Sequence, residues 1–180
     1  MQLKLQPDII HADAVFDATR KYRYALYRTW DEKKPDVMIF IGLNPSTADE
    51  THDDPTVRKC INVAKRDNCG SMVMLNIFAY RSTNPKGLSD VDDPVGRPFN
   101  NQAISSHCQG QRWIVVAWGR HGKYMNREEE VLNLLKGKEL LCFFTNKDNS
   151  PMHPLYVSLQ DPLIPFYIFG INEKEKVMLT

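Results

Sequence analysis

Short runs of apolar residues recur along the chain, separated by polar segments that contain Gly and Pro. The runs Val37–Ile41, 71–79, 112–118 and 139–144 predict four strands, of which the first is covered on both faces of a sheet. Residues 21–30 alternate instead and predict a further strand near the N-terminus. We expect its two faces to carry Tyr22, Tyr24, Leu26, Arg28 and Trp30 on one side, and Arg23, Ala25, Tyr27 and Thr29 on the other.

A helix is predicted between the first and second apolar runs. Asp54 and Pro55 are typical of an N-cap and a first helical residue. Apolar positions then follow at helical spacing, namely Val57, Ile61 and Ala64. This helix is predicted to end near residues 68–70, where Asn and Gly occur.

Two shorter helices are predicted later in the chain. Residues 100–108 favour one of them. Residues 126–137 favour the other, with Asn126 as its N-cap, acidic residues in its first turn and Gly137 at its end. Residues 81–98 are rich in Pro, Gly and Asp and are predicted to form a long loop.

Strands that alternate with helices predict an α/β protein. We expect three α/β/α layers, with a mostly parallel central sheet of about four strands and an additional N-terminal strand. No internal repeat or low-complexity linker divides the chain, so residues 1–180 are predicted to form a single domain. The apolar segment 156–170 suits either a role in closing the core or a surface for a partner.

Composition and charge narrow the class of protein. The chain has 23 basic and 22 acidic residues, and this balance lacks the basic excess of dedicated DNA-binding proteins, although it leaves room for a local basic patch. No run of about 18 apolar residues is present, so no membrane association is expected. The N-terminus lacks the apolar core of a signal peptide, and the cysteines form no CxxC pair. Free thiols in a cytoplasmic protein are therefore expected, while the oligomeric state is left open.

A metal site at His52, Asp53 and Asp54 is disfavoured. Consecutive residues do not converge easily on one ion, and helix capping already accounts for Asp54. No metal or other cofactor is therefore expected.

Polar segments follow all of the apolar runs, at the edge of the sheet where ligands bind in folds of this kind. The first run leads into Gly42, Leu43, Asn44, Pro45 and Ser46, and the second carries Asn76, Phe78, Tyr80 and Arg81 at its end. The third leads into Trp118, Gly119, Arg120, His121 and Lys123, and the fourth is followed by His153. Structural turns do not require amides, cations, an imidazole and aromatic rings from separate loops. We therefore predict a functional cleft at this edge.

The chemistry of these side chains suits a nucleobase or a nucleotide. Amides can pair with the edge of a base, aromatic rings can stack on its face, and cations can hold phosphates. Structural roles compete with these assignments. Asn44 can hold its own turn, and Asn76 can be a satisfied buried amide. His153 can be a structural histidine, and Trp118 can belong to the core.

The segment IGLNPS, residues 41–46, resembles the first motif of the uracil-DNA glycosylase superfamily, in particular that of its mismatch-specific uracil and thymine glycosylase branch. Three later segments resemble the superfamily's later motifs and occur in the same order: MLNIFAYRST (74–83), IVVAWGRHGKY (114–124) and SPMHPLY (150–156). The resemblance implies the fold of that superfamily, with Asn76 reading a flipped pyrimidine and His153 facing the base. The most active members carry an Asp where this chain has Asn44. An amide can orient water but cannot act as a general base.

Nearly the whole chain also resembles the phage and bacterial proteins called domain of unknown function 1643. The shared segments are RYALYRTW, LNPSTAD, DDPTVRKC, FAYRST, DPVG, AWGRHG and MHPLY. This second resemblance implies no activity, so the functional hypothesis rests on the glycosylase motifs and on the chemistry of the strand ends.

The sequence thus leads to one main hypothesis and two alternatives. The main hypothesis is a nucleobase-recognising protein that hydrolyses the N-glycosidic bond of a pyrimidine, modified or not, in DNA. Asn44 is expected to place the attacking water, and His153 to stabilise the leaving base. One alternative is a protein that binds a nucleotide or modified base without cleaving it. The other is an enzyme that acts on free nucleotides.

Overall fold

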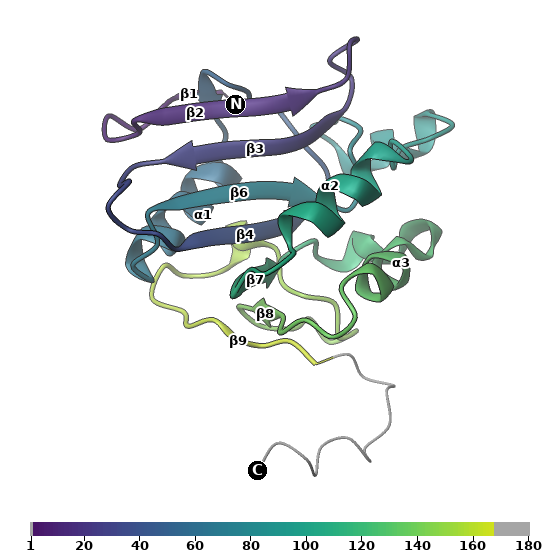
Figure 1. The fold of residues 1–180 in the computed structure, drawn as a ribbon. Helices are drawn as coiled ribbons and strands as arrows, with labels where there is room; N and C mark the ends of the chain where they lie inside the picture. The colour runs from purple at the N-terminus through teal and green to yellow at the C-terminus, as the bar shows by residue number, and fades with distance from the viewer. Residues whose placement is uncertain (1, 168–180) are drawn as a thin grey trace.

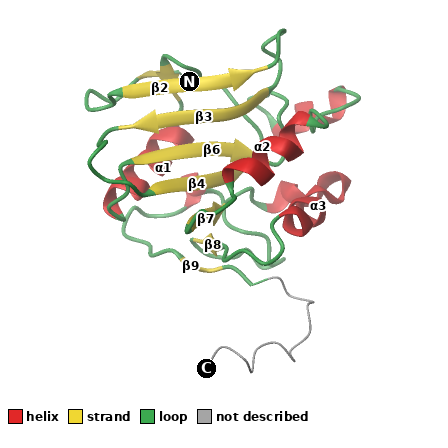
Figure 2. Cartoon of the chain, viewed as in Figure 1, coloured by secondary structure: helices red, strands yellow, loops and turns green. Residues whose placement is uncertain are grey.

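Seven strands form one mixed sheet in the computed structural model, which describes residues 2–167 (Figure 1 and Figure 2). In chain order these strands are β2 (His11–Phe16), β3 (Arg23–Thr29), β4 (Val37–Gly42), β6 (Ser71–Asn76), β7 (Trp113–Val116), β8 (Leu141–Cys142) and β9 (Ile164–Pro165). Their order across the sheet is β2-β3-β6-β4-β7-β8-β9. A separate antiparallel pair joins β1 (Leu3–Lys4) to β5 (His52–Asp53).

Parallel pairing is confined to the centre of the sheet. β4 pairs in parallel with β6 and β7, and β7 pairs in parallel with β8. β2, β3 and β9 are added in antiparallel orientation. The four strands predicted from the apolar runs are therefore parallel to one another, but the sheet as a whole has seven strands and is mixed, rather than mostly parallel with about four strands and one N-terminal strand. The difference arises because β2 and β3 form an N-terminal hairpin, and because β9 is a short strand in a Pro-containing segment that carries no strand pattern.

Helices cover both faces of the sheet, as the α/β prediction requires. α1 (Pro55–Arg66) packs on one face, in a cluster that includes Met38 and Phe40. α2 (Phe99–His107) and α3 (Arg127–Leu134) pack on the other face, through Ile104 and Val131. The 3₁₀ helices η1 (Pro85–Asp90), η2 (Arg120–Asn126) and η3 (Pro154–Tyr156) lie in the connections. In Figure 1, α1 lies behind the sheet, whereas α2 crosses in front of it.

One predicted helix cap is confirmed, and another is confirmed only in its position. Oδ1 of Asp54 accepts a hydrogen bond from the Val57 N–H at 2.9 Å, and Pro55 begins α1. At α3, by contrast, the Asn126 side chain makes no capping hydrogen bond. Met125 and Asn126 both have a left-handed backbone, with φ of 57° and 54°, because the chain turns sharply there between η2 and α3. The side chain of Asn126 therefore cannot reach the first turn as a cap.

A bulge in β3 changes which of its side chains share a face. The pairing of β3 with β2 skips Tyr24, so the alternation shifts by one residue. As a result, Arg23 lies on the same face as Leu26 and Arg28, next to α1. The prediction that grouped Arg23 with Ala25 is wrong, because strict alternation takes no account of a bulge.

The described part of the apolar C-terminal segment, residues 156–167, packs on the core. Val157 is buried, Leu163 packs against the cluster on the α1 face, and Phe166 packs against the cluster on the opposite face. These contacts show that this part closes the core. Residues 168–170 of the predicted segment lie outside the described residues.

The cysteines, Cys60, Cys69, Cys108 and Cys142, are all free and buried. Burial raises the pKa of Cys69, Cys108 and Cys142 to about 11, so these groups are thiols rather than reactive thiolates at neutral pH. Within residues 2–167, His, Cys, Asp and Glu nowhere gather in a group able to hold a metal ion. In the same range, no helix has the length and apolar character needed to cross a bilayer.

Candidate functional site

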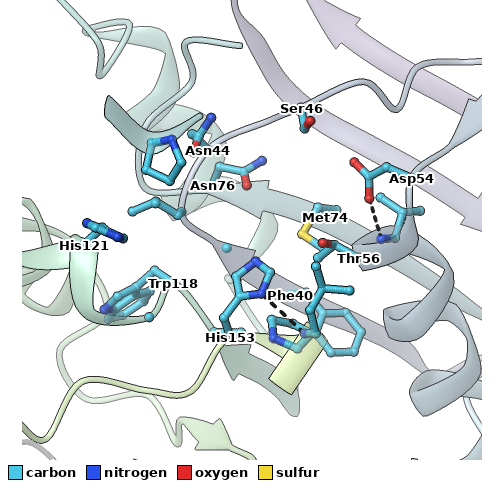
Figure 3. Close-up of a pocket in the computed structure, with 18 of the residues that line it drawn as sticks. Phe40, Asn44, Ser46, Asp54, Thr56, Met74, Asn76, Trp118, His121 and His153 are labelled. Carbon is cyan, nitrogen blue, oxygen red and sulfur yellow. Dashed lines mark hydrogen bonds between the residues drawn. The ribbon is translucent and has the colours of Figure 1, made fainter. Parts of the chain in front are cut away.

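A cavity of about 610 Å³ opens beyond the carboxyl ends of β4, β6 and β7 (Figure 3). The chain runs from β4 through α1 to β6 on one side, and then through α2 to β7 on the other side of β4. The cavity therefore lies at a topological switch point of the sheet, where ligands commonly bind in α/β folds.

Most of the predicted site residues line this cavity. They are Gly42, Leu43, Asn44, Ser46, Asn76, Trp118, Gly119, Arg120, His121 and His153. The remaining predicted residues, Pro45, Phe78, Tyr80, Arg81 and Lys123, do not line it. The sheet edge thus brings together the polar groups of several loops, but not every group that follows a strand.

The predicted aromatic residues lie largely in the core. Phe78 is completely buried, and the Tyr80 ring packs edge-on against Tyr22 with 5.6 Å between ring centroids. Trp118 lines the cavity but is 1% exposed, and its indole N–H donates a hydrogen bond to Glu128 at 3.1 Å. These rings are held by packing and hydrogen bonding, so none of them offers an open face for stacking.

The predicted cations also differ in position. Arg81 donates from Nε to the main-chain oxygen of Ser46 at 3.4 Å and so supports the turn after β4 from outside the cavity. Lys123 forms an ion pair with Asp148 at 3.5 Å. Arg120 and His121 are exposed and line the cavity.

The turn after β4 is fixed to the chain that follows β6. Main-chain hydrogen bonds run from Ile77 N–H to the Gly42 oxygen and from Phe78 N–H to the Leu43 oxygen, both at 2.9 Å. The amide nitrogen of Asn44 donates to the main-chain oxygen of Ser82 at 2.7 Å. Asn44 thus has a structural role, because its amide nitrogen ties the two loops together.

Asn76 contributes a buried amide at the end of β6. Its side chain is 4% exposed, and the amide nitrogen has no hydrogen-bond partner among the described residues. A Cβ atom on Gly42 would lie 3.0 Å from its Oδ1, so the glycine leaves the space that this amide occupies. A buried donor without a partner costs about 1–3 kcal/mol. A ligand in the cavity that accepts this hydrogen bond would recover that cost.

His153 enters the cavity from the loop before η3. Its Nδ1 accepts a hydrogen bond from the Leu155 N–H at 3.3 Å, which leaves the proton of the neutral ring on Nε2. Burial lowers the pKa of His153 below its usual 6.5, and the charge of Asp54 partly opposes this effect. At neutral pH the residue is therefore an uncharged hydrogen-bond donor. In Figure 3 its ring lies in the same cavity as Asn76 and Thr56.

Asp54 and Arg23 also line the cavity. From its place just after the turn that follows β4, Asp54 could be expected to approach the cleft, whereas nothing in the sequence pointed to Arg23. The Asp54 side chain is 6% exposed, and one of its oxygens caps α1. Arg23 is 2% exposed and donates from Nη1 to the Ala48 oxygen at 2.8 Å. Burial lowers the pKa of Arg23 to about 10, which still leaves the guanidinium charged at neutral pH. The cavity therefore holds a carboxylate and a cation that come from outside the strand-end motifs.

A buried ion pair fixes the part of the cavity that β3 and the start of α1 form, where Arg23 and Asp54 lie. Arg28 donates from Nε to Asp53 Oδ1 at 2.9 Å, and both side chains are fully buried. Its Nη2 also donates to the main-chain oxygens of Asp49 and His52. β3 is thereby fastened to the segment that leads into α1. Further lining residues, which were not among the predicted site residues, include Phe40, Thr56, Val57, Met74, Ser82, Thr83, Asn146 and Tyr156.

The model of a family described as "Protein of unknown function (DUF1643)" matches residues 23–155, which is most of the chain. The chain belongs to this family. The matched region contains β3, the turn after β4, Asn76 and His153, so the family match includes the residues described above on each side of the cavity. No curated protein and no solved structure matches the chain.

Proposed function

We propose that this DUF1643 protein binds a pyrimidine base in the cavity and hydrolyses the N-glycosidic bond between that base and its sugar. The observation that carries the proposal is the unpartnered amide of Asn76, buried at the carboxyl end of β6. An amide presents a donor and an acceptor side by side, which is the pattern needed to pair with the edge of a base. The motif resemblance to uracil-DNA glycosylases assigns the same residue to base reading.

His153 supports the cleavage step of this proposal. As the C1′–N bond breaks, its electron pair leaves with the base, and negative charge develops on the ring. A neutral imidazole that donates from Nε2 stabilises that charge by hydrogen bonding. Its lowered pKa, caused by burial, favours this uncharged form. The leaving base then takes up a proton from water.

Asp54 can supply the general base that Asn44 cannot. Water attacks C1′, and its proton passes to the carboxylate oxygen of Asp54 that does not cap α1. In this scheme Asn44 positions the turn, because its amide nitrogen is bound to Ser82. This modifies the expectation that Asn44 places the water and adds a residue that lies outside the glycosylase-like motifs.

In this proposal the base stacks on aromatic residues other than those predicted from the sequence. Phe78 and Tyr80 do not line the cavity, whereas Phe40 and Tyr156 do. Phe40 is buried and Tyr156 is 80% exposed, so the two rings suit an inner and an outer contact respectively. Aromatic contacts of this kind are worth about 1–3 kcal/mol per base.

A second candidate is binding without cleavage. It is favoured by one observation, the hydrogen bond that holds Asn44 to Ser82, because the residue aligned with a catalytic Asp is engaged in structure. In that case the cavity would recognise a base or nucleotide and release it unchanged.

The test is mass spectrometry of reactions between the purified protein and a panel of substrates. The panel holds single- and double-stranded oligonucleotides with uracil, thymine mismatches or modified pyrimidines, together with free nucleosides and nucleotides. Release of a base by the wild type is expected, with loss of release in Asn76→Leu, which keeps the branched shape of the side chain and removes the amide. Asn44→Ala serves as a second variant, in which a disturbed turn lowers release.

Two outcomes would contradict the proposal. No release from any substrate by a folded protein would favour binding without cleavage. Release that persists unchanged in Asn76→Leu would remove the assignment of base reading to this amide. Thermal unfolding of each variant separates either outcome from loss of the fold.

A further inference from the structure

Arg23 differs from the other buried arginines of the described structure. Arg28 and Arg127 are each 0% exposed, and each forms an ion pair at 2.9 Å, with Asp53 and Glu130 respectively. Arg23 is 2% exposed, but within residues 2–167 no carboxylate oxygen lies within 4.0 Å of its guanidinium. Two of these arginines thus have an ion-pair partner, whereas Arg23 has none within 4.0 Å and is opposed only by the more distant charges of Asp54 and Asp49.

The hydrogen bonding of Arg23 is incomplete as well. Nη1 donates to the Ala48 oxygen at 2.8 Å, while Nε has no partner among the described residues. A buried cation without a counter-ion costs several kcal/mol. The guanidinium nonetheless stays charged at neutral pH, because burial lowers its pKa only to about 10. Such a group is retained most readily where an anion from outside the protein binds beside it.

We propose that Arg23 forms a phosphate subsite in the cavity, which takes a phosphate ester on the sugar of the nucleoside whose base Asn76 holds. This inference rests on the proposed function and names its substrate class, a nucleotide rather than a nucleoside. A guanidinium offers a planar fork of donors that matches phosphate oxygens. The hydroxyl of Ser46 lines the same cavity and can donate to the same group.

The dimensions and charge of the site suit one phosphate. A cavity of about 610 Å³ lies within the range of pockets that enclose a small ligand, about 300–1,000 Å³. A single buried cation contacts one phosphate, whereas proteins that track a nucleic-acid backbone use an open groove with several cations. The phosphate can belong to a free nucleotide or to a nucleotide within a DNA strand.

The experiment measures dissociation constants by calorimetry for four kinds of probe: a pyrimidine 2′-deoxynucleoside, its 5′- and 3′-monophosphates, a trinucleotide with the same base in the centre, and inorganic phosphate. The wild type is expected to bind one of the monophosphates at least about tenfold more tightly than the nucleoside, since hydrogen bonds to a charged group are worth about 1.5–3 kcal/mol. Arg23→Gln is expected to abolish this preference and to leave nucleoside binding nearly unchanged. If the role of Arg23 were merely structural, Arg23→Gln would weaken the binding of the nucleoside and of the monophosphate equally.

Arg112→Gln is the matched control. It removes the same charge from an exposed residue just before β7, at the end of the strand opposite the cavity. The preference for a phosphate is expected to persist in this variant. If Arg23→Gln does not fold, the comparison of nucleoside with monophosphate in the wild type still decides the matter, and Arg23→Lys tests whether charge alone suffices.

The outcomes separate this inference from the proposed function. Nucleoside binding without any preference for a phosphate would overturn the subsite and leave the proposed function standing. No nucleoside binding would count against the proposed function, and inorganic phosphate would then test the subsite alone: binding that is lost in Arg23→Gln supports it, and no binding overturns it. Tighter binding of the trinucleotide than of the monophosphates would identify a DNA strand as the source of the phosphate.

Discussion

The cavity has two unlike walls. The wall at the carboxyl ends of the parallel strands presents two inner groups that are uncharged at neutral pH, the amide of Asn76 and, from the loop before η3, the imidazole of His153. The cation Arg120 also lines this wall, but it is exposed. The wall formed by β3 and the start of α1 presents a cation and a carboxylate, Arg23 and Asp54. The first wall can recognise a base by hydrogen bonds, and the second can handle a phosphate and a proton. The uncharged and the charged buried groups of the cavity thus come from different parts of the fold.

The charged wall is fixed by the antiparallel part of the sheet. β3 is anchored by the Arg28–Asp53 ion pair, and its bulge at Tyr24 turns Arg23 toward the α1 face. The neutral wall needs neither an ion pair nor a bulge to bring its residues together, because the carboxyl ends of parallel strands lie at one edge of the sheet. Substitutions confined to one wall test whether the two walls have separate roles.

The largest effect is expected from Asp54→Asn. Asparagine is as good an N-cap as aspartate, so α1 and the fold are expected to persist. Loss of the general base is expected to lower the rate of base release by about a thousandfold, with little change in ligand affinity. Single-turnover kinetics with the best substrate of the panel measures this effect. An unchanged rate would show that the carboxylate takes no part in the reaction.

His153→Ala is expected to have the next largest effect. It removes the hydrogen bond to the leaving base, and the rate of release is expected to fall by about a hundredfold. The affinity for the unreacted substrate should change less than the rate, because charge develops on the base only as the bond breaks. Equal losses in rate and in affinity would instead place His153 in binding alone. His11→Ala, at an exposed position in β2, is the matched control.

A smaller effect is expected from Gly42→Ala. The new Cβ would lie 3.0 Å from Oδ1 of Asn76, so the amide must shift by a few tenths of an ångström. Such a shift misplaces the donor and acceptor, and we expect base affinity to fall by about tenfold. Calorimetry with a pyrimidine nucleoside measures this change. If phosphate binding also weakened in this variant, the two walls would not be independent.

The neutral wall could be predicted from the sequence, but the position of Arg23 in the charged wall could not. Asn76 and His153 follow apolar runs, and the rule that parallel strands end at a common edge brings them together. Arg23 lies in an alternating strand whose bulge reverses the face of this one residue, and no local pattern marks a bulge there. Asp54 was correctly predicted as a cap, and its place just after the turn that follows β4 already allowed it to approach the cleft, where it lies.

The full extent of the sheet could likewise be predicted only in part from the sequence. The central strands β4 and β6 are apolar throughout, so their runs predict them well. β2 has alternating exposed and half-buried residues, and β9 has only two residues. The predicted strand 139–144 exists, but it is shortened to Leu141–Cys142 in β8. Strands of this kind are defined by their partners rather than by their own pattern. The aromatic residues were misplaced for a related reason, since a ring near a strand end can pack inward, as Phe78 does.

The smallest effect, and the one that tests communication between the walls, concerns the pKa of His153. Burial lowers this pKa, and the negative charge of Asp54 opposes the lowering. Asp54→Asn is therefore expected to lower the pKa of His153 further, which an NMR titration of the ring protons measures. Because the folded state has the lower pKa, the unfolded chain binds the proton more readily below about pH 6.5. The free energy of unfolding should thus decrease as the pH falls through that value, and the decrease should continue to a lower pH in Asp54→Asn. An unchanged pKa in this variant would show that the charged wall is electrically screened from the imidazole.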